Sequence, residues 1–82
     1  MEKAIDLDRL RRAYRGKSTL LVARGMRILR RLQHGTATIE ELRRPDYLTA
    51  SQAHRAIRVA REILDGSRWH LECDGVYFLT KW

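Results

Sequence analysis

The hydrophobic positions between Thr49 and Gly66 recur at helical spacing, which predicts an amphipathic helix over this stretch. Its expected buried side consists of Ala53, Ala56, Ile57, Ala60, Ile63 and Leu64. Its expected polar side consists of Ser51, Gln52, His54, Arg55, Arg58 and Arg61. Thr49 and Ser51 are both suitable N-cap residues, and Gly66 is typical of the position after a helix C-terminus. One side of this helix is therefore expected to pack, while the other carries arginine.

Two more helical patterns precede this helix. Asp6 can cap a short basic helix, whose apolar side is expected to contain Leu7, Leu10 and Tyr14. After a break at residues 16–18, a longer helix is expected over about residues 19–34, with Ser18 as its cap. Its expected inward residues are Leu21, Val22, Gly25, Ile28, Leu29 and Leu32, and its outer arginines are Arg24, Arg27 and Arg31.

A short helix is expected within residues 36–44, because Thr38 and Glu41 have the S/T-x-x-E spacing of a capping box. Its expected buried residues are Ile39 and Leu42, and Ala37 is expected to pair as a single strand residue. Pro45 and Asp46 are expected to end this helix. Two helices joined by a tight turn are the helix-turn-helix arrangement.

After Gly66 the hydrophobic pattern alternates, which predicts a β-hairpin around the turn Asp74-Gly75. A two-residue turn sets Cys73 opposite Val76, Leu71 opposite Phe78 and Trp69 opposite Thr80. These six residues are expected to face the helices. The expected outer face consists of Arg68, His70, Glu72, Tyr77, Leu79 and Lys81, with Arg68 opposite Lys81 at the base.

This order of elements predicts an α+β fold, a winged helix-turn-helix with a three-helix core and a C-terminal two-stranded wing over residues 19–82. Residues 1–18 are interpreted as an additional basic helix or arm that helps a dimer form or lies against phosphates. A chain of 82 residues is expected to make one domain with a compact core.

Four short motifs along the chain resemble the DNA-binding domain of IclR-type regulators. They are Arg24 with Ile28, Leu29 and Leu32, then Glu41-Leu42, then Ser51-Gln52-Ala53-His54-Arg55, and finally Gly75-Val76-Tyr77-Phe78-Leu79. MarR-type proteins and small phage regulators are similar in the same way. Two features depart from the IclR pattern: Tyr47 stands where a turn glycine is usual, and no effector domain is expected after the wing. The resemblance implies DNA binding as a dimer, with the third core helix in the major groove.

The charge of the chain favours a polyanionic partner. It has 17 Lys+Arg against 10 Asp+Glu, a formal net charge of +7, and most of the basic residues are arginine. The planar guanidinium binds phosphate or guanine through two donors at once. A single cysteine, Cys73, excludes an internal disulfide. Because no signal peptide or membrane span is evident, the expected location is intracellular, cytoplasmic or nucleoid-associated.

Catalytic and metal chemistry find little support in the sequence. The string GKST at residues 16–19 does not fit a phosphate-binding loop, because Arg11 replaces the required glycine and no strand precedes it. His70 and Cys73 form only a fragment of a zinc site. No carboxylate pair or nucleophile–base set has supporting context. The protein is therefore expected to be no enzyme and to need no metal or cofactor.

The candidate DNA-binding residues lie mainly on the 49–66 helix. The expected base-facing residues are Ser51, Gln52 and Arg55, because these types hydrogen-bond to base edges. The expected phosphate contacts are Arg58, Lys17 and Arg68. His54 is assigned either to a phosphate contact or to the core. The opposing interpretation is an ordinary amphipathic helix whose charged side faces only water.

The favoured hypothesis is a sequence-specific double-stranded DNA-binding protein, a small homodimeric transcriptional regulator from a virus or other mobile element, without a small-molecule effector domain. An alternative is a winged-helix protein-interaction module or adaptor subunit, which the acidic turn and an exposed Tyr77 and Leu79 would support. Single-stranded nucleic acid binding ranks lower, because few aromatic residues are expected to be exposed for base stacking.

Overall fold

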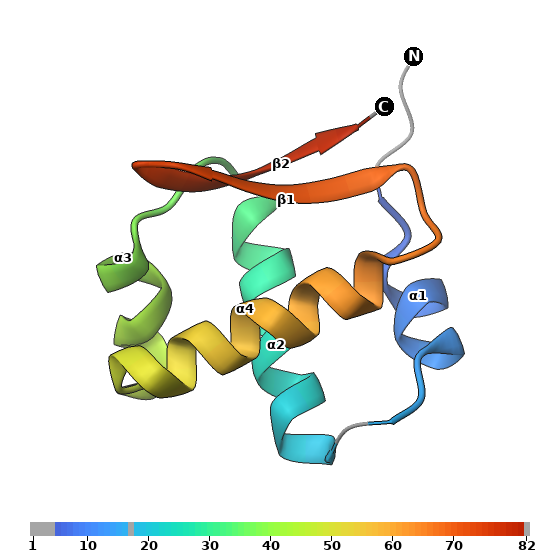
Figure 1. Ribbon diagram of the computed structural model, residues 1–82, viewed down its shortest axis with the longest axis horizontal. Helices are drawn as coiled ribbons and strands as arrows, with labels where there is room; N and C mark the ends of the chain where they lie inside the picture. Colours follow the sequence, from blue (N-terminus) through green and yellow to red (C-terminus); the bar gives the residue numbers. More distant parts are fainter. Residues whose placement is uncertain (1–4, 17, 82) are drawn as a thin grey trace.

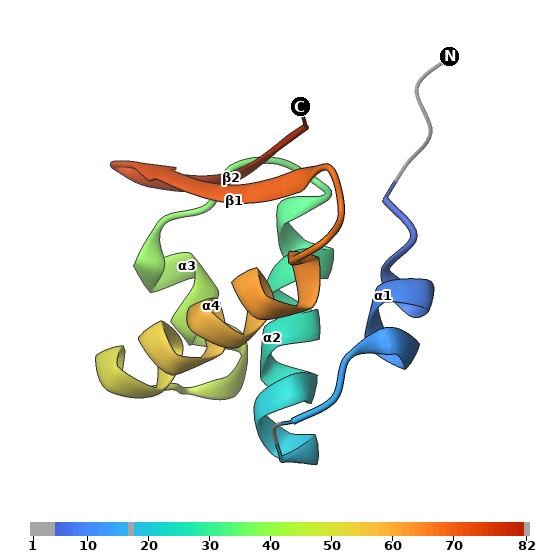
Figure 2. The same ribbon diagram turned by 45° about the vertical axis from the view of Figure 1, so that its right-hand side comes forward.

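The computed structural model describes residues 5–16 and 18–81. The described residues form four α-helices and one antiparallel hairpin, so the predicted α+β class is confirmed. The elements are α1 (Leu7–Ala13), α2 (Thr19–Leu32), α3 (Ile39–Arg43), the 3-10 turn η1 (Arg44–Asp46), α4 (Ala50–Leu64), β1 (Trp69–Asp74) and β2 (Val76–Lys81). In Figures 1 and 2 the hairpin lies over one side of the helices, with α1 and α3 at opposite ends.

Side-chain caps set the starts of all four described helices where the sequence predicts them. Asp6 Oδ1 accepts a hydrogen bond from the Arg9 N–H (3.1 Å), and Ser18 Oγ accepts one from the Leu21 N–H (3.3 Å). Capping boxes begin both α3 and α4. The end of α2 was predicted less well, because the helix stops at Leu32 rather than His34. A turn replaces the last expected residues there, and Gly35 adopts a φ of +137° in it.

The crossing of α2 over α4 forms the centre of the core. Every residue predicted for the apolar side of α4 is buried, and Leu29 on α2 has no exposed surface. Gly25 brings the two backbones close, because a Cβ there would lie 3.2 Å from the Ala60 nitrogen. Val59 and Met26 are also buried, although neither was predicted to be. Ile39, predicted to be buried, is only half-buried at the edge of the core.

The N-terminal helix packs against the other helices. Ile5 and Leu7 lie in the same hydrophobic core as α2 and α4. The Tyr14 hydroxyl donates to Glu62 Oε1 on α4 (2.5 Å), and Gln33 Nε2 donates to the Ile5 carbonyl (3.2 Å). These contacts fix α1 at the C-terminal half of α4, well away from the start of that helix.

The Tyr14–Glu62 contact predicts a loss of stability in alkaline solution. Burial, followed by the hydrogen bond and the negative charge of Glu62, raises the pKa of Tyr14 from 10.0 to about 12. Because the folded-state pKa is the higher one, the contact stabilises fully below pH 10.0 and is lost as pH rises towards about 12. Replacing Tyr14 by Phe should cost about 1 kcal/mol near neutral pH.

Urea denaturation of the wild type and Tyr14→Phe at pH 8 to 12 measures this difference. The two unfolding free energies should converge as pH rises through the Tyr14 titration. A constant difference across the whole range would show that the hydrogen bond does not depend on the phenol proton.

The hairpin register differs from the prediction by one residue. Asp74 pairs with Val76 around Gly75, whose φ is +77°. The pairing along the strands sets Cys73 opposite Tyr77, Glu72 opposite Phe78, Leu71 opposite Leu79, His70 opposite Thr80 and Trp69 opposite Lys81. A one-residue shift reverses the faces of one strand relative to the other. The expected pairing of Arg68 with Lys81 is therefore wrong.

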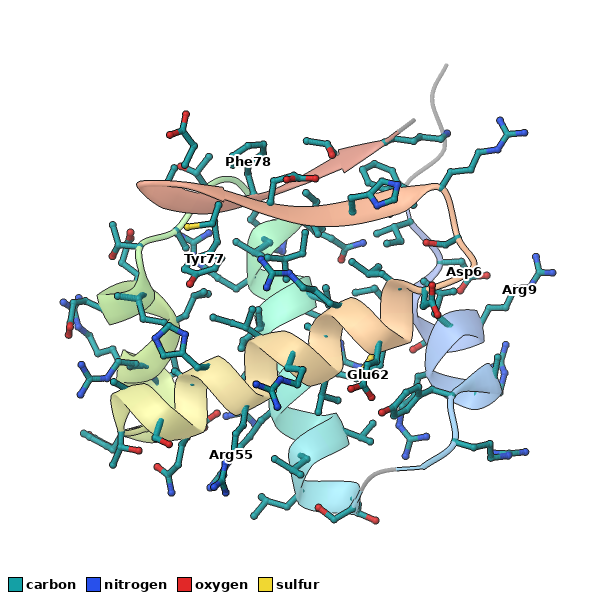
Figure 3. All side chains as sticks on the ribbon, in the orientation of Figure 1. Asp6, Arg9, Arg55, Glu62, Tyr77 and Phe78 are labelled. Carbon is teal, nitrogen blue, oxygen red and sulfur yellow. The ribbon has the colours of Figure 1, made fainter. Side chains whose placement is uncertain are left out.

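The faces of β2 are accordingly the reverse of those predicted. Tyr77 and Leu79 pack against the core, whereas Phe78 points away from the helices (Figure 3). The physical reason is a tertiary contact: the Ala37 N–H donates to the Tyr77 carbonyl (3.1 Å) and the Tyr77 N–H donates to the Ala37 carbonyl (2.7 Å). The predicted single strand residue at Ala37 is thus confirmed, and it pairs with β2. On β1 the prediction holds for Leu71, which is buried, and for Trp69, which packs against the core, whereas Cys73, also predicted to face the helices, is exposed because it lies near the turn of the hairpin.

Candidate nucleic-acid interface

The exposed side of α4 is held in place by contacts at both ends and along its buried side. At the start, Thr49 Oγ1 accepts a hydrogen bond from the Gln52 N–H (3.1 Å). At the other end, Arg61 Nε donates to the Leu71 carbonyl on β1 (3.3 Å). Because the apolar side is buried, the polar residues of α4 that are left exposed are Ser51, His54, Arg55, Arg58 and Arg61. The uncovered side of the helix is therefore a fixed surface.

Gln52 contributes less to this surface than the sequence suggests. Its Oε1 accepts a hydrogen bond from the Thr49 N–H (2.9 Å), which completes the capping box. Paired recognition of adenine needs the oxygen and the nitrogen of the same side-chain amide. In this arrangement Oε1 already holds the Thr49 N–H, which ties the side chain to the helix start and leaves Nε2 as its freer group. His54, by contrast, is exposed, so its alternative assignment to the core is wrong.

Arg55 and Arg58 are both exposed and lie one helical turn apart. Neither makes a hydrogen bond or an ion pair with any residue in the described part of the chain. Arg55 points away from the hairpin in Figure 3. Two long cations therefore stand on the open side of α4 with all their donors available.

Three arginines of α2 and α3, unlike Arg55 and Arg58, have acidic partners. Arg27 pairs with Asp46, Arg31 lies 3.5 Å from Glu41, and Arg43 lies 2.9 Å from Glu40. Such exposed pairs add little stability. These acidic groups of α3 and η1 are paired with arginines of α2 and α3, and none of them forms an ion pair with Arg55 or Arg58 on α4.

Among the described residues, the basic residue predicted to contact DNA outside α4 does not lie beside Arg55 and Arg58. Arg68 is exposed directly before β1, beyond the far end of α4, a helix of 15 residues and roughly 22 Å. Lys81 lies over the Trp69 ring, 5.8 Å from its centroid. Lys17 lies outside the described residues. The structure therefore brings Ser51, His54, Arg55 and Arg58 together and leaves Arg68 apart from them.

Two residues absent from the predicted site lie beside it. Tyr47 is 92% exposed in the turn before α4, and Arg44 in η1 is also exposed. The sequence could have drawn attention to Tyr47, because a tyrosine is unusual in a tight turn. Its exposure could not be predicted, because it depends on the geometry of that turn. Arg44 also lies near Glu41, whose pKa is lowered first by the hydrogen bond from the Thr38 N–H and to a smaller extent by Arg31 and Arg44.

The other surface features give no competing site. The hollow between the end of α4 and β1, about 340 Å³, is open and lined by charged and polar groups as well as Trp69. No group of three or more His, Cys, Asp or Glu is placed to hold a metal ion among the residues that the structure describes. No described helix is long and apolar enough to cross a membrane.

The arrangement can bind an anionic surface: it offers exposed guanidinium, imidazole and hydroxyl donors on the uncovered side of one rigid helix. Comparison with protein-family models, curated proteins and solved structures found no match to this chain.

Proposed function

We propose that this protein binds double-stranded DNA through α4, which serves as the recognition helix of a winged helix-turn-helix. The observation that carries the proposal is the pair of exposed, unpartnered arginines Arg55 and Arg58 on the open side of that helix. The short turn between α3 and α4 and the hairpin that follows agree with the arrangement.

The dimensions of α4 support this function. An α-helix with its side chains is about 10–12 Å wide, and the major groove of B-DNA is about 12 Å wide. Ser51, His54 and Arg55 lie in the N-terminal half of α4, the part of a recognition helix that meets base edges. Arg58, one turn further along, is assigned to phosphate. The role of the protein in this proposal is that of a small transcriptional regulator acting as a homodimer on two half-sites.

Binding of a fluorescent duplex over a salt series tests the proposal. Each phosphate that is neutralised should contribute about −0.9 to the slope of log K against log salt concentration. Two α4 arginines and the flanking cations should give a slope of about −3 or steeper. A slope near zero, or no binding at low salt, would contradict the proposal. Selection from a random duplex pool would then identify the preferred sequence.

The alternative of a protein-interaction module has lost its main support. That alternative relied on exposed Tyr77 and Leu79, and both of these side chains pack against the core. The acidic residue Asp74 at the turn is exposed, but a single carboxylate specifies no partner. DNA binding is therefore the function that the described surface supports best.

A further inference from the structure

Tyr47 combines a costly backbone conformation with an almost fully exposed aromatic ring. Its φ is +54°, the left-handed region, and no other non-glycine residue of the described chain has a positive φ. Its exposed fraction is 92%. A bulky residue in this conformation is disfavoured relative to glycine, and an exposed ring gains no burial in return. Such features concentrate at sites that contact ligands.

The backbone of the turn does not need this side chain. The Tyr47 N–H donates to the Arg44 carbonyl (3.2 Å), and the Leu48 N–H donates to the Arg43 carbonyl (3.0 Å). Arg43 Nε donates in turn to the Leu48 carbonyl (2.9 Å), and Leu48 is buried. These contacts close the turn through main-chain groups, Arg43 and Leu48. The phenol makes no hydrogen bond with any described residue.

Tyr47 and Arg44 border one shallow hollow of about 290 Å³, together with Glu40, Arg43 and Leu48. Within this hollow Arg43 is engaged by Glu40 and by the Leu48 carbonyl, so Arg44 is the cation left to an outside partner. The hollow precedes α4 by only a few residues, so a duplex seated on α4 would pass its phosphodiester backbone nearby.

We infer that Tyr47 and Arg44 form a phosphodiester-binding site beside the recognition helix, an inference that rests on the proposed function. The Tyr47 hydroxyl donates to a non-bridging phosphate oxygen, and the Arg44 guanidinium neutralises the same stretch of backbone. The contact carries no base information. It fixes the position of α4 relative to the groove.

Three variants test this site by duplex titration over a salt series. Tyr47→Phe removes only the hydroxyl and should weaken binding about 10-fold or more, the effect of one hydrogen bond to a charged acceptor, at an unchanged salt slope. Arg44→Ala should weaken binding and make the slope shallower by about 0.9, because one phosphate is no longer neutralised. Tyr47→Asn should weaken binding while raising the thermal midpoint by several degrees, because asparagine tolerates a positive φ.

The outcomes separate this inference from the proposed function. Wild-type affinity in both Tyr47 variants, with binding still weakened by changes at Arg55 and Arg58, would overturn the Tyr47 site alone. Absence of salt-dependent duplex binding by the wild type would overturn both. A lower thermal midpoint in Tyr47→Asn would assign the tyrosine to the fold instead of the ligand.

Discussion

Replacing Arg55 and Arg58 together by glutamate is expected to weaken duplex DNA binding by about 100-fold or more, with little change in stability. An arginine that reads guanine contributes about 1–3 kcal/mol, and a phosphate contact adds its share of counterion release. Both side chains are exposed and unpartnered among the described residues, so their replacement removes no internal contact. Titration of labelled duplex and a thermal melt measure the two effects.

The matched control is Arg9→Glu with Arg12→Glu on α1. These two residues are also exposed, and the double replacement removes the same amount of charge. Arg9 lies on α1, at the far end of the molecule from Arg55 (Figure 3). The control should lose only a few-fold in affinity through the weaker overall attraction. Equal losses in the two double variants would mean that net charge, and no particular surface, governs binding.

Replacing Gly25 by leucine is expected to destabilise the fold by about 3 kcal/mol or more, near the upper end of overpacking effects. A Cβ at this position already meets Val59 Cγ1 at 3.2 Å and the Ala56 carbonyl oxygen at 3.4 Å. A leucine side chain would push α2 and α4 apart at the centre of the core. Because a chain of this size has only about 4–12 kcal/mol of total stability, its thermal midpoint should fall by roughly 12 °C or more.

Gly25→Leu also separates the effect of packing between α2 and α4 from the effect of helix propensity at this position. Leucine favours a helix over glycine by somewhat under about 1 kcal/mol, so any loss of stability must arise from the packing between the helices. Ala23→Leu is the control, since Ala23 is exposed on the same helix. Circular dichroism melts should show a nearly unchanged midpoint for Ala23→Leu. A midpoint for Gly25→Leu at or above that of the wild type would contradict the close crossing.

The helices could be predicted because their signals are local. Asp6, Ser18, Thr38 and Thr49 each cap within three residues of the helical turn that they satisfy. The periodic apolar residues of α4 form one continuous side of the helix, which the neighbouring elements cover. Local signals therefore predict three helix starts closely and allow two possible caps for α4. Val59 lies outside the predicted apolar side of α4. It is buried because the buried side is wider where α4 crosses α2 at Gly25.

The hairpin register could not be predicted from its own residues. Asp74-Gly75 is compatible with more than one turn, and the alternation in β2 gives apolar residues on both faces. The choice between registers is made by Tyr77, which pairs with Ala37 from a distant part of the chain. A contact of that kind leaves no signal in a pattern confined to residues 69–81.

In the candidate site, too, features set by local signals could be predicted and features set by distant contacts could not. The exposure of Arg55 and Arg58 follows from helical periodicity and was predictable. The separation of paired from unpaired arginines was not, since the partners Arg27 and Asp46 are 19 positions apart. The engagement of Gln52 in the α4 cap was also missed, although Thr49 and Gln52 have the required spacing.

The bridge between Ala37 and Tyr77 joins the hairpin to the loop between α2 and α3 as a single mechanical unit. Each residue holds the other's N–H, so neither amide is released unless hairpin and loop separate together. Bending of the hairpin is therefore transmitted to the start of α3 through this loop, as well as to α4 through the Arg61–Leu71 hydrogen bond. A load on the wing would therefore act on both ends of the turn, on α3 through the loop and on the proposed recognition helix through β1.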